Sequence, residues 1–139
     1  MFDLPHVVAE AAPTLKSYGL GDRMTSASGD FFQAVPAGAD LYLLSMVLHD
    51  WNDVDATRLL TNIRNAAAPG SRILALELIM PMGDQPHLSK MIDLTMLGML
   101  NGRERTESEM KALFECAGLV YDGVVATPTP ISIIESRVR

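Results

Sequence analysis

Short apolar runs alternate along the chain with segments of helical periodicity. Residues 41–47 and 73–79 form near-continuous apolar runs of strand length, which are typical of strands buried on both faces of a sheet. Between these runs, Asn52 precedes a segment with apolar positions at helical spacing: Ala56, Leu59, Leu60, Ile63 and Ala67. Strand, helix and strand in this order predict a right-handed crossover that joins two parallel strands.

The amino-terminal segment predicts two further strands with a helix between them. Residues 1–3 resemble the end of a strand, and residues 23–28 resemble a short second strand. A helix is expected from about Pro5, since proline is well tolerated at the first helical position. Pro13 is expected to kink or split this helix, because proline removes a backbone hydrogen bond.

The carboxyl-terminal third predicts two helices and a pair of strands. Residues 88–100 predict a helix that is apolar nearly all round, and Thr106 with Glu109 three residues later forms the capping box of a second helix. Residues 119–126 and 131–138 predict an antiparallel pair at a sheet edge. The expected fold class is α/β, with a mostly parallel sheet that ends in this antiparallel pair.

Composition narrows the class of protein. The 139 residues fit one domain, and we expect residues 1–139 to form it. The formal net charge of −6 argues against a nucleic-acid partner, which favours a basic surface. Cys116 is the only cysteine, so an internal disulfide is excluded and a reducing, cytoplasmic setting is expected. No signal peptide or apolar run of membrane-spanning length is visible, so we expect a soluble protein without a membrane partner.

Two residues near the ends of the central strands are not explained by the apolar pattern. His49 directly follows the first apolar run, and Glu77 lies inside the second. Because ligands of open α/β sheets bind beyond the carboxyl ends of the strands, both side chains are expected near one crevice. A histidine bonded to a carboxylate is a good general base. The alternative, that His49 caps a strand and Glu77 pairs with a basic neighbour, is left open by these residues alone.

Two aspartates also follow presumed strand ends. In Rossmann units an acidic residue at such a place binds ribose hydroxyls, and Asp3 and Asp30 are candidates for this role. A helix cap at Asp3 and a turn at Asp30 are the structural alternatives, which the residues alone favour.

Six motifs occur along the chain in one order: Asp3-Leu4-Pro5, Gly29-Asp30-Phe31-Phe32, Leu48-His49-Asp50-Trp51, Glu77 with Pro81 soon after, Gly102-Arg103-Glu104-Arg105-Thr106, and Ala117-Gly118-Leu119. This series resembles the S-adenosylmethionine-dependent O-methyltransferase family, which includes plant caffeic-acid-type enzymes and bacterial polyketide and carotenoid-pathway enzymes. The resemblance covers essentially the whole chain and implies an incomplete Rossmann-like, class I methyltransferase sheet. It also implies that the family's first strand, glycine-rich turn and amino-terminal dimerisation domain lie outside these residues.

The resemblance implies a catalytic group made of His49, Glu77 and Glu104. His49 would remove the proton from the acceptor hydroxyl, while Glu77 and Glu104 would flank the imidazole and hold its orientation. No metal is required for this chemistry, and no cluster of metal ligands is apparent in the sequence.

The resemblance also implies where S-adenosylmethionine and the methyl acceptor bind. The expected cofactor residues are Asp3 at the ribose, Gly29, Asp30 and Phe31 at the adenine, and Ser45, Asp50 and Trp51 on the cofactor side of the site. Ser45 stands where many relatives carry lysine. The acceptor pocket would be lined by Met91, Met96 and Met99, because methionine adapts well to flat aromatic rings.

Methyl transfer to a hydroxyl of a small aromatic or polyketide-like acceptor is therefore the leading expectation, in a parent protein that forms homodimers. The alternative is a non-catalytic fragment that acts as an interaction module or is a remnant. A hydrolase is disfavoured, because the chain has no Gly-x-Ser-x-Gly elbow.

Overall fold

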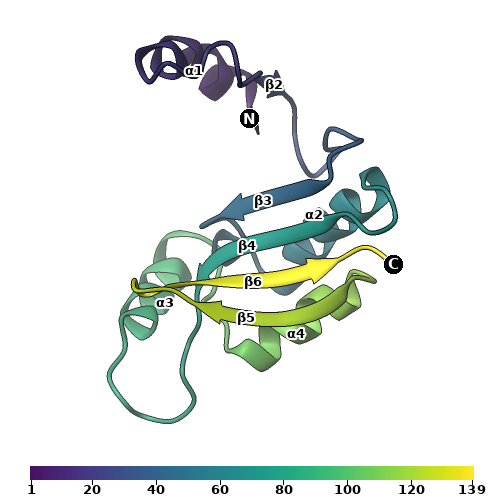
Figure 1. The fold of residues 1–139 in the computed structure, drawn as a ribbon. Helices are drawn as coiled ribbons and strands as arrows, with labels where there is room; N and C mark the ends of the chain where they lie inside the picture. The colour runs from purple at the N-terminus through teal and green to yellow at the C-terminus, as the bar shows by residue number, and fades with distance from the viewer.

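The computed structural model describes residues 1–139, and its main body is a four-stranded sheet (Figure 1). The strands follow the order β3-β4-β6-β5, where β3 is Leu41–Ser45, β4 is Arg72–Leu78, β5 is Val120–Ala126 and β6 is Ile131–Arg137. Strands β3 and β4 are parallel, and β6 is antiparallel to both β4 and β5. The predicted α/β class, the parallel pair and the antiparallel pair are confirmed.

Helices α2 (Asp53–Ala66) and α4 (Glu107–Cys116) cover one face of this sheet (Figure 1). Both start where the sequence predicts: the Asn52 side chain accepts hydrogen bonds from two backbone N–H groups of α2, and Thr106 with Glu109 forms the capping box of α4. The buried faces of the two helices meet the sheet in one hydrophobic core: Leu48, Ala56, Leu59, Leu60, Ile63, Ile73, Ala75, Met110, Leu113, Phe114, Ala117, Leu119 and Ile134.

Helix α3 (Leu88–Met99) lies outside this core, near the carboxyl end of β4 (Figure 1). Among its residues only Ser89 is buried, and five apolar side chains are exposed: Leu88, Met91, Leu94, Leu97 and Met99. None of the helices combines the length and the apolar character that crossing a membrane requires.

A second, smaller piece of sheet contains the amino terminus (Figure 1). Strand β1 (Phe2–Asp3) pairs in parallel with β2 (Ala27–Ser28), and helix α1 (Pro5–Ser17) connects them. Because α1 continues through Pro13 as one helix, the expected split at this proline does not occur.

Strand β2 is shorter than the predicted strand over residues 23–28. The N–H groups of Arg23 and Met24 both donate to the carbonyl of Leu20, at 3.0 and 2.9 Å. These bonds hold the first part of the predicted strand in a turn, so only Ala27 and Ser28 remain extended and paired.

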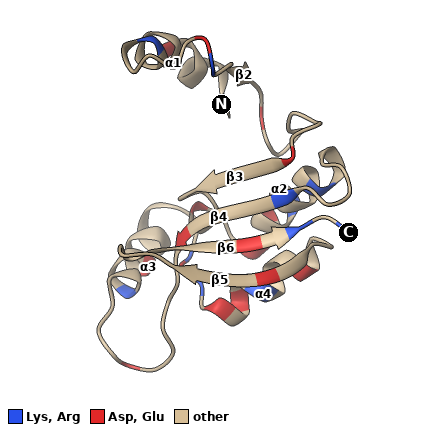
Figure 2. Ribbon diagram, viewed as in Figure 1, with Lys and Arg blue, Asp and Glu red and all other residues tan.

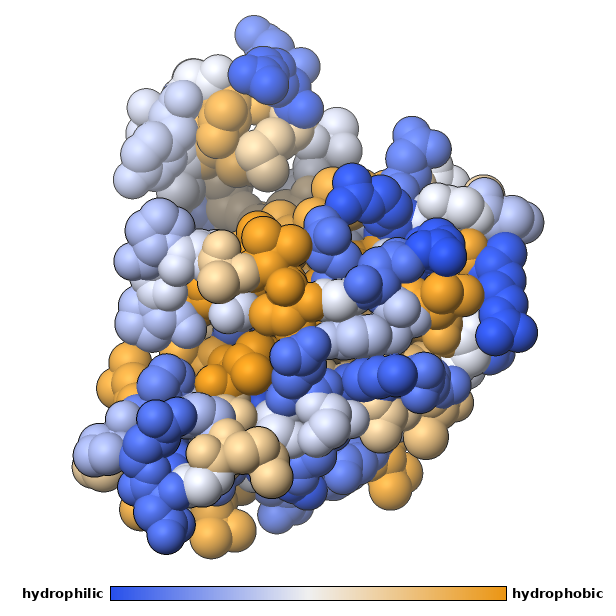
Figure 3. Space-filling view, turned by 60° about the horizontal axis from the view of Figure 1, so that its bottom comes forward, coloured by the Kyte–Doolittle hydropathy of each residue, from blue (hydrophilic) through white to orange (hydrophobic).

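Strand β3 differs from the prediction that it is buried on both faces. It is the edge strand of the four-stranded sheet, and Leu41 and Leu43 are 48% and 60% exposed. No backbone pairing joins β3 to β1, and a mainly apolar recess of about 210 Å³ lies between them, lined by residues such as Phe2 and Leu43. Figure 3 shows hydrophobic surface gathered in and around a hollow of the molecule.

Basic and acidic residues lie on the neighbouring strands β4, β6 and β5 (Figure 2), and two ion pairs join these strands. The Arg72 guanidinium lies 2.8 Å from the Glu135 carboxylate, and Arg137 pairs with Asp122. Exposed pairs of this kind contribute about 0–1 kcal/mol each to stability. These two pairs therefore add little to the free energy of unfolding, although they are consistent with the register of the strands.

Candidate active site

The chain turns sharply where β3 ends. Met46 has a φ of 52°, a left-handed conformation that is strained for a residue with a side chain, and its N–H donates to the carbonyl of Leu76 at 3.0 Å. A short 3₁₀ turn, Leu48–Asp50, follows and contains His49, which is 7% exposed. We call residues 47–51 the His49 turn.

The imidazole of His49 is held by a buried carboxylate. Its Nδ1 lies 2.8 Å from Oε1 of Glu104, a residue that is itself buried. If Nδ1 carries the proton and donates it to Glu104, Nε2 is left as the proton acceptor. The hydrogen bond that Glu104 accepts raises the pKa of His49 above its ordinary value, against the lowering effect of burial. The charges of Glu77, Glu104 and Asp50 also raise this pKa.

Glu77 lies beside the His49 turn but holds its backbone rather than its imidazole. Oε1 of Glu77 accepts hydrogen bonds from the N–H groups of Val47 and Leu48, at 3.0 and 2.8 Å. No hydrogen bond joins Glu77 to the His49 ring, although the charge of Glu77 raises the pKa of His49. Glu77 binds the backbone that leads into His49, and its role in orienting the ring stays a prediction. Glu77 also has no basic partner, and the structural alternative of an ion pair is wrong.

The Glu77 carboxyl group is completely buried, and its second oxygen has no hydrogen-bond partner. Burial raises the pKa of Glu77 above its ordinary value, although its bonds to Leu48 and Val47 and the nearby His49 lower it. A buried carboxyl that serves as a double acceptor for backbone N–H groups explains a glutamate inside an apolar strand.

Asp93 of α3 is part of the same network and was not recognised in the sequence. Its Oδ1 accepts the N–H of Glu104 at 2.8 Å, so α3 is tied to the carboxylate that holds His49. An aspartate in a mainly apolar helix could have indicated a special role for Asp93. The fold is needed to show that it binds the backbone N–H of Glu104.

The residues expected at the adenine and ribose end of the cofactor lie around the recess between β1 and β3. Asp3 and Phe31 both line this recess. Asp3 uses one carboxylate oxygen to accept the N–H of Leu4, and Asp30 uses one to accept the N–H of Phe32. Each carboxylate therefore forms a local turn and keeps a second oxygen for another partner.

Gly29 lies where the two strands of the small sheet end. Its N–H donates to the carbonyl of Asp3 at 3.0 Å, and a Cβ at this position would lie 2.8 Å from the Phe2 ring. A larger residue would therefore require the Phe2 ring to move at the wall of the recess.

Aromatic rings connect this region with the His49 turn. The ring centroids of Phe32 and Trp51 are 4.6 Å apart in an edge-to-face arrangement, and Phe31 lies 6.0 Å from Trp51. The predicted adenine-end residues and the predicted catalytic turn therefore belong to one packed cluster, although about twenty residues separate them in the sequence.

The other predicted binding residues are more dispersed. Asp50 and Trp51 line a second recess of about 220 Å³, and Ser45 is exposed at the end of β3. On α3, Met91 and Met99 are exposed and line none of the main recesses. Met96 is half-buried. The expected acceptor pocket is therefore not enclosed by these residues.

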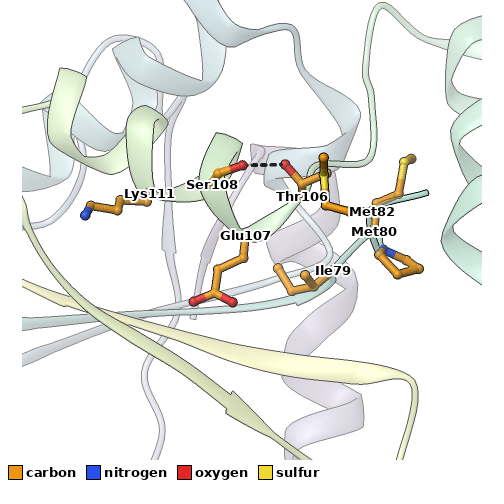
Figure 4. A pocket seen from close by; sticks show the side chains of 8 residues that line it. Ile79, Met80, Met82, Thr106, Glu107, Ser108 and Lys111 are labelled. Carbon is orange, nitrogen blue, oxygen red and sulfur yellow. Dashed lines mark hydrogen bonds between the residues drawn. The ribbon is translucent and has the colours of Figure 1, made fainter.

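A larger recess, about 500 Å³, lies between the loop after β4 and the first turn of α4 (Figure 4). Its lining includes Met80, Met82 and Glu107, together with the hydroxyls of Thr106 and Ser108, which lie 3.1 Å apart. None of the predicted catalytic residues lines it, so its size does not make it the active site.

A family model described as an O-methyltransferase domain matches residues 1–120. The chain belongs to this O-methyltransferase family. It is 42% identical over 137 residues to phenazine O-methyltransferase PhzM of Lysobacter antibioticus, and the match spans 99% of this chain but only 40% of the relative.

Solved structures support the same family and fold. A crystal structure of LaPhzM superposes with a TM-score of 0.96 at 41% identity, over 100% of this chain and 42% of that one. The O-methyltransferase NcsB1 from neocarzinostatin biosynthesis, solved with S-adenosylmethionine and 2-hydroxy-5-methyl naphthoic acid, gives a TM-score of 0.88 at 33% identity, over 99% of this chain and 40% of that one. The fold is therefore that of part of a class I methyltransferase.

Not every relative is named for methyl transfer to oxygen. The aclacinomycin 10-hydroxylase RdmB of Streptomyces purpurascens is 40% identical over 124 residues, covering 84% of this chain and 33% of that protein. Family membership alone therefore does not determine the reaction, which depends on the side chains of the site.

Proposed function

We propose that this chain forms part of an S-adenosylmethionine-dependent methyltransferase that acts on a hydroxyl group of a small aromatic or polyketide-like acceptor. The observation that carries the proposal is the buried pair of His49 and Glu104 at the carboxyl end of β3. A chain that kept the sheet only as an interaction module would have no need to bury this pair. The relatives reported above carry the names of enzymes, so the non-catalytic alternative is not supported.

Several residues of this chain fit the cofactor. Asp3 and Asp30 each keep one carboxylate oxygen outside their local turns, which suits the hydroxyls of a ribose and the polar edge of an adenine. Phe31 offers an apolar surface in the same recess as Asp3. Gly29 supports the wall of this recess, and Ser45, Asp50 and Trp51 would serve nearer the reacting end. The cofactor, when bound, supplies an electrophilic methyl group.

His49 performs the proton transfer in this proposal. Nε2 would accept the proton of the acceptor hydroxyl, and the Glu104 carboxylate would stabilise the imidazolium that forms. Glu77 holds the backbone that precedes His49, so the ring stays in place during the step. The apolar side chains of α3, Met91, Met96 and Met99 among them, would face the acceptor once the rest of its pocket is present, and a homodimer is the proposed assembly.

The test uses the gene product that contains these residues, with S-adenosylmethionine and a panel of hydroxylated phenazines and naphthoic acids. His49→Ala should slow methyl transfer by about 10²- to 10⁴-fold and leave cofactor affinity nearly unchanged. His6→Ala and His87→Ala are matched controls, because these histidines lie outside the His49 turn. Products that gain an oxygen rather than a methyl group, or an unchanged rate in His49→Ala, would overturn the proposal.

A further inference from the structure

Arg105 is completely buried directly behind the His49 turn. Its guanidinium bonds to backbone carbonyls on both sides of the catalytic residue: Nη1 donates to Leu48 at 2.8 Å, and Nη2 donates to Trp51 at 2.7 Å. Nε and Nη2 also contact Oδ1 of Asp53 at 2.9 and 2.8 Å. The side chain therefore joins both ends of the His49 turn to the first turn of α2.

The segment that contains Arg105 lies directly against the backbone of this turn. The N–H of Arg103 donates to the carbonyl of His49 at 2.9 Å. A Cβ added to Gly102 would lie 2.0 Å from the same carbonyl oxygen and 2.6 Å from the carbonyl carbon of Asp50, so only glycine permits this approach. Residues 102–105, which we call the clamp, thus donate hydrogen bonds to three carbonyls of the turn, those of Leu48, His49 and Trp51.

The turn has little cohesion of its own. Its internal backbone bonds are long, 3.2 Å from Asp50 to Val47 and 3.3 Å from Trp51 to Leu48. A single 3₁₀ turn is a weak structure, so its geometry must be imposed by neighbouring groups. The planar fork of an arginine can hold several acceptors at fixed angles at once, whereas the ammonium group of a lysine cannot.

We propose that Arg105 is a positioning residue that fixes the His49 turn, so that the imidazole meets Glu104 at hydrogen-bond distance. The inference rests on the proposed role of His49 as the base. Glu104 and Arg105 are adjacent in the clamp, and they act on different parts of one target: Glu104 binds the ring, and Arg105 binds the backbone that bears it. Asp53 is the only carboxylate that forms an ion pair with the Arg105 guanidinium, and its side chain is 59% exposed. The guanidinium therefore has its counter-charge on the solvent side, and its other partners are buried backbone carbonyls.

The test measures the pKa of His49 by ¹⁵N nuclear magnetic resonance in the 139-residue chain, which requires no catalytic activity. Arg105→Lys keeps the positive charge and removes the fork, so any change reports geometry rather than charge. If the turn loosens, contact with Glu104 weakens, and the pKa of His49 should fall back toward 6.5, its ordinary value. The carboxylates that face the ring, Glu77, Glu104 and Asp50, remain unaltered in this variant.

Arg64→Lys is the matched control. Arg64 also donates to a backbone carbonyl, that of Ala117 at 2.9 Å, but it has no contact with the His49 turn. It should lower the melting temperature without moving the titration of His49. If Arg105→Lys fails to fold, Asp53→Asn gives a milder version of the test, because it removes the negative charge that the guanidinium contacts and leaves the carbonyl bonds. Asp55→Asn, which removes an equal charge from the same turn of α2, shows how much of any shift comes from charge alone.

The outcomes separate the inference from the proposed function. A raised wild-type pKa that Arg105→Lys, or Asp53→Asn in its place, leaves unchanged would show that Arg105 is a structural residue only. An ordinary pKa for His49 in the wild type would instead be evidence against the hydrogen bond to Glu104 on which the proposed function rests. A downward shift in the Arg105 or Asp53 variant, absent in Arg64→Lys, supports the positioning role.

Discussion

Nδ1 of His49 lies 2.8 Å from Oε1 of Glu104, although 55 residues separate them in the sequence. The contact joins the end of β3 to the connection between α3 and α4, two parts of the chain that share no helix or strand. Because Glu104 binds Nδ1, the nitrogen left for proton transfer is Nε2, which lies 3.4 Å from Oδ1 of Asp50. The contact therefore assigns different roles to the two ring nitrogens of His49.

The charge of Glu104 should set the pH dependence of catalysis in the complete enzyme. The pKa of His49 is raised, so the base becomes protonated and the rate falls as pH decreases through that raised pKa. Glu104→Gln removes the charge and should lower the pKa of His49, which moves the acid limb of kcat/KM to lower pH. The rate at the plateau should also fall, because a weaker base accepts the proton. Glu135→Gln, a change in an exposed pair, should leave the profile in place; a profile equally unmoved in Glu104→Gln would contradict the assignment.

Glu77 should matter for stability through its acceptor oxygen rather than through its charge. Glu77→Ala leaves the N–H groups of Val47 and Leu48 without a partner, at a cost of about 1–3 kcal/mol each in free energy of unfolding. Glu77→Gln keeps an acceptor oxygen and should be much less destabilising. Urea unfolding of the three proteins at neutral pH measures the difference.

The pH dependence of stability gives a second readout for the same pair of variants. Burial raises the pKa of Glu77 above 4.5, so its protonated form stabilises the fold below that pH, and this contribution is lost as pH rises through the raised pKa. Glu77→Gln cannot titrate and should lose less stability than the wild type over this rise. Parallel curves for the two proteins would mean that Glu77 is ionised normally in the fold.

Local signals predicted much of the fold. Asn52 before a periodic segment and Thr106 three residues before Glu109 mark helix starts through contacts within one turn, and both starts occur as expected. The exposure of Leu43 could not be predicted in this way. An apolar strand has the same sequence whether its free edge is covered or open, and only the arrangement of the sheets decides.

The same limit applies within the site. The motif around His49 identified the residue, but spacing along the chain does not reveal that Glu77 binds backbone while Glu104 binds the ring. No signal in the sequence indicates that Arg105 is buried, since arginine is usually exposed. Its burial depends on carbonyls from the His49 turn that become available only when the chain folds.

The open edge of β3 should make the 139-residue chain self-associate. Leu41 and Leu43 are exposed beside unpaired backbone groups, which favours edge-to-edge pairing between copies. Leu43→Lys should increase the monomer fraction in sedimentation velocity. Val54→Lys changes an exposed apolar side chain on α2 and should have little effect. Equal shifts in both variants would indicate general solubility rather than association through β3.

The 139-residue chain should bind S-adenosylmethionine weakly or not at all. It spans about 40% of the length of its relatives, and the resemblance places only ribose and adenine contacts, with part of the reacting end, among its residues. The resemblance implies that the methionine portion of the cofactor is contacted by a glycine-rich turn outside these residues.

Each missing hydrogen bond to a charged group costs about 1.5–3 kcal/mol, so the loss of two weakens binding on the order of 10²-fold or more. Calorimetry on the monomeric fraction measures this affinity, with Asp3→Asn as the comparison that should weaken any residual binding. Micromolar affinity would contradict the prediction. It would mean that the recess between β1 and β3, together with the aromatic cluster of Phe31 and Trp51, is sufficient to hold the cofactor.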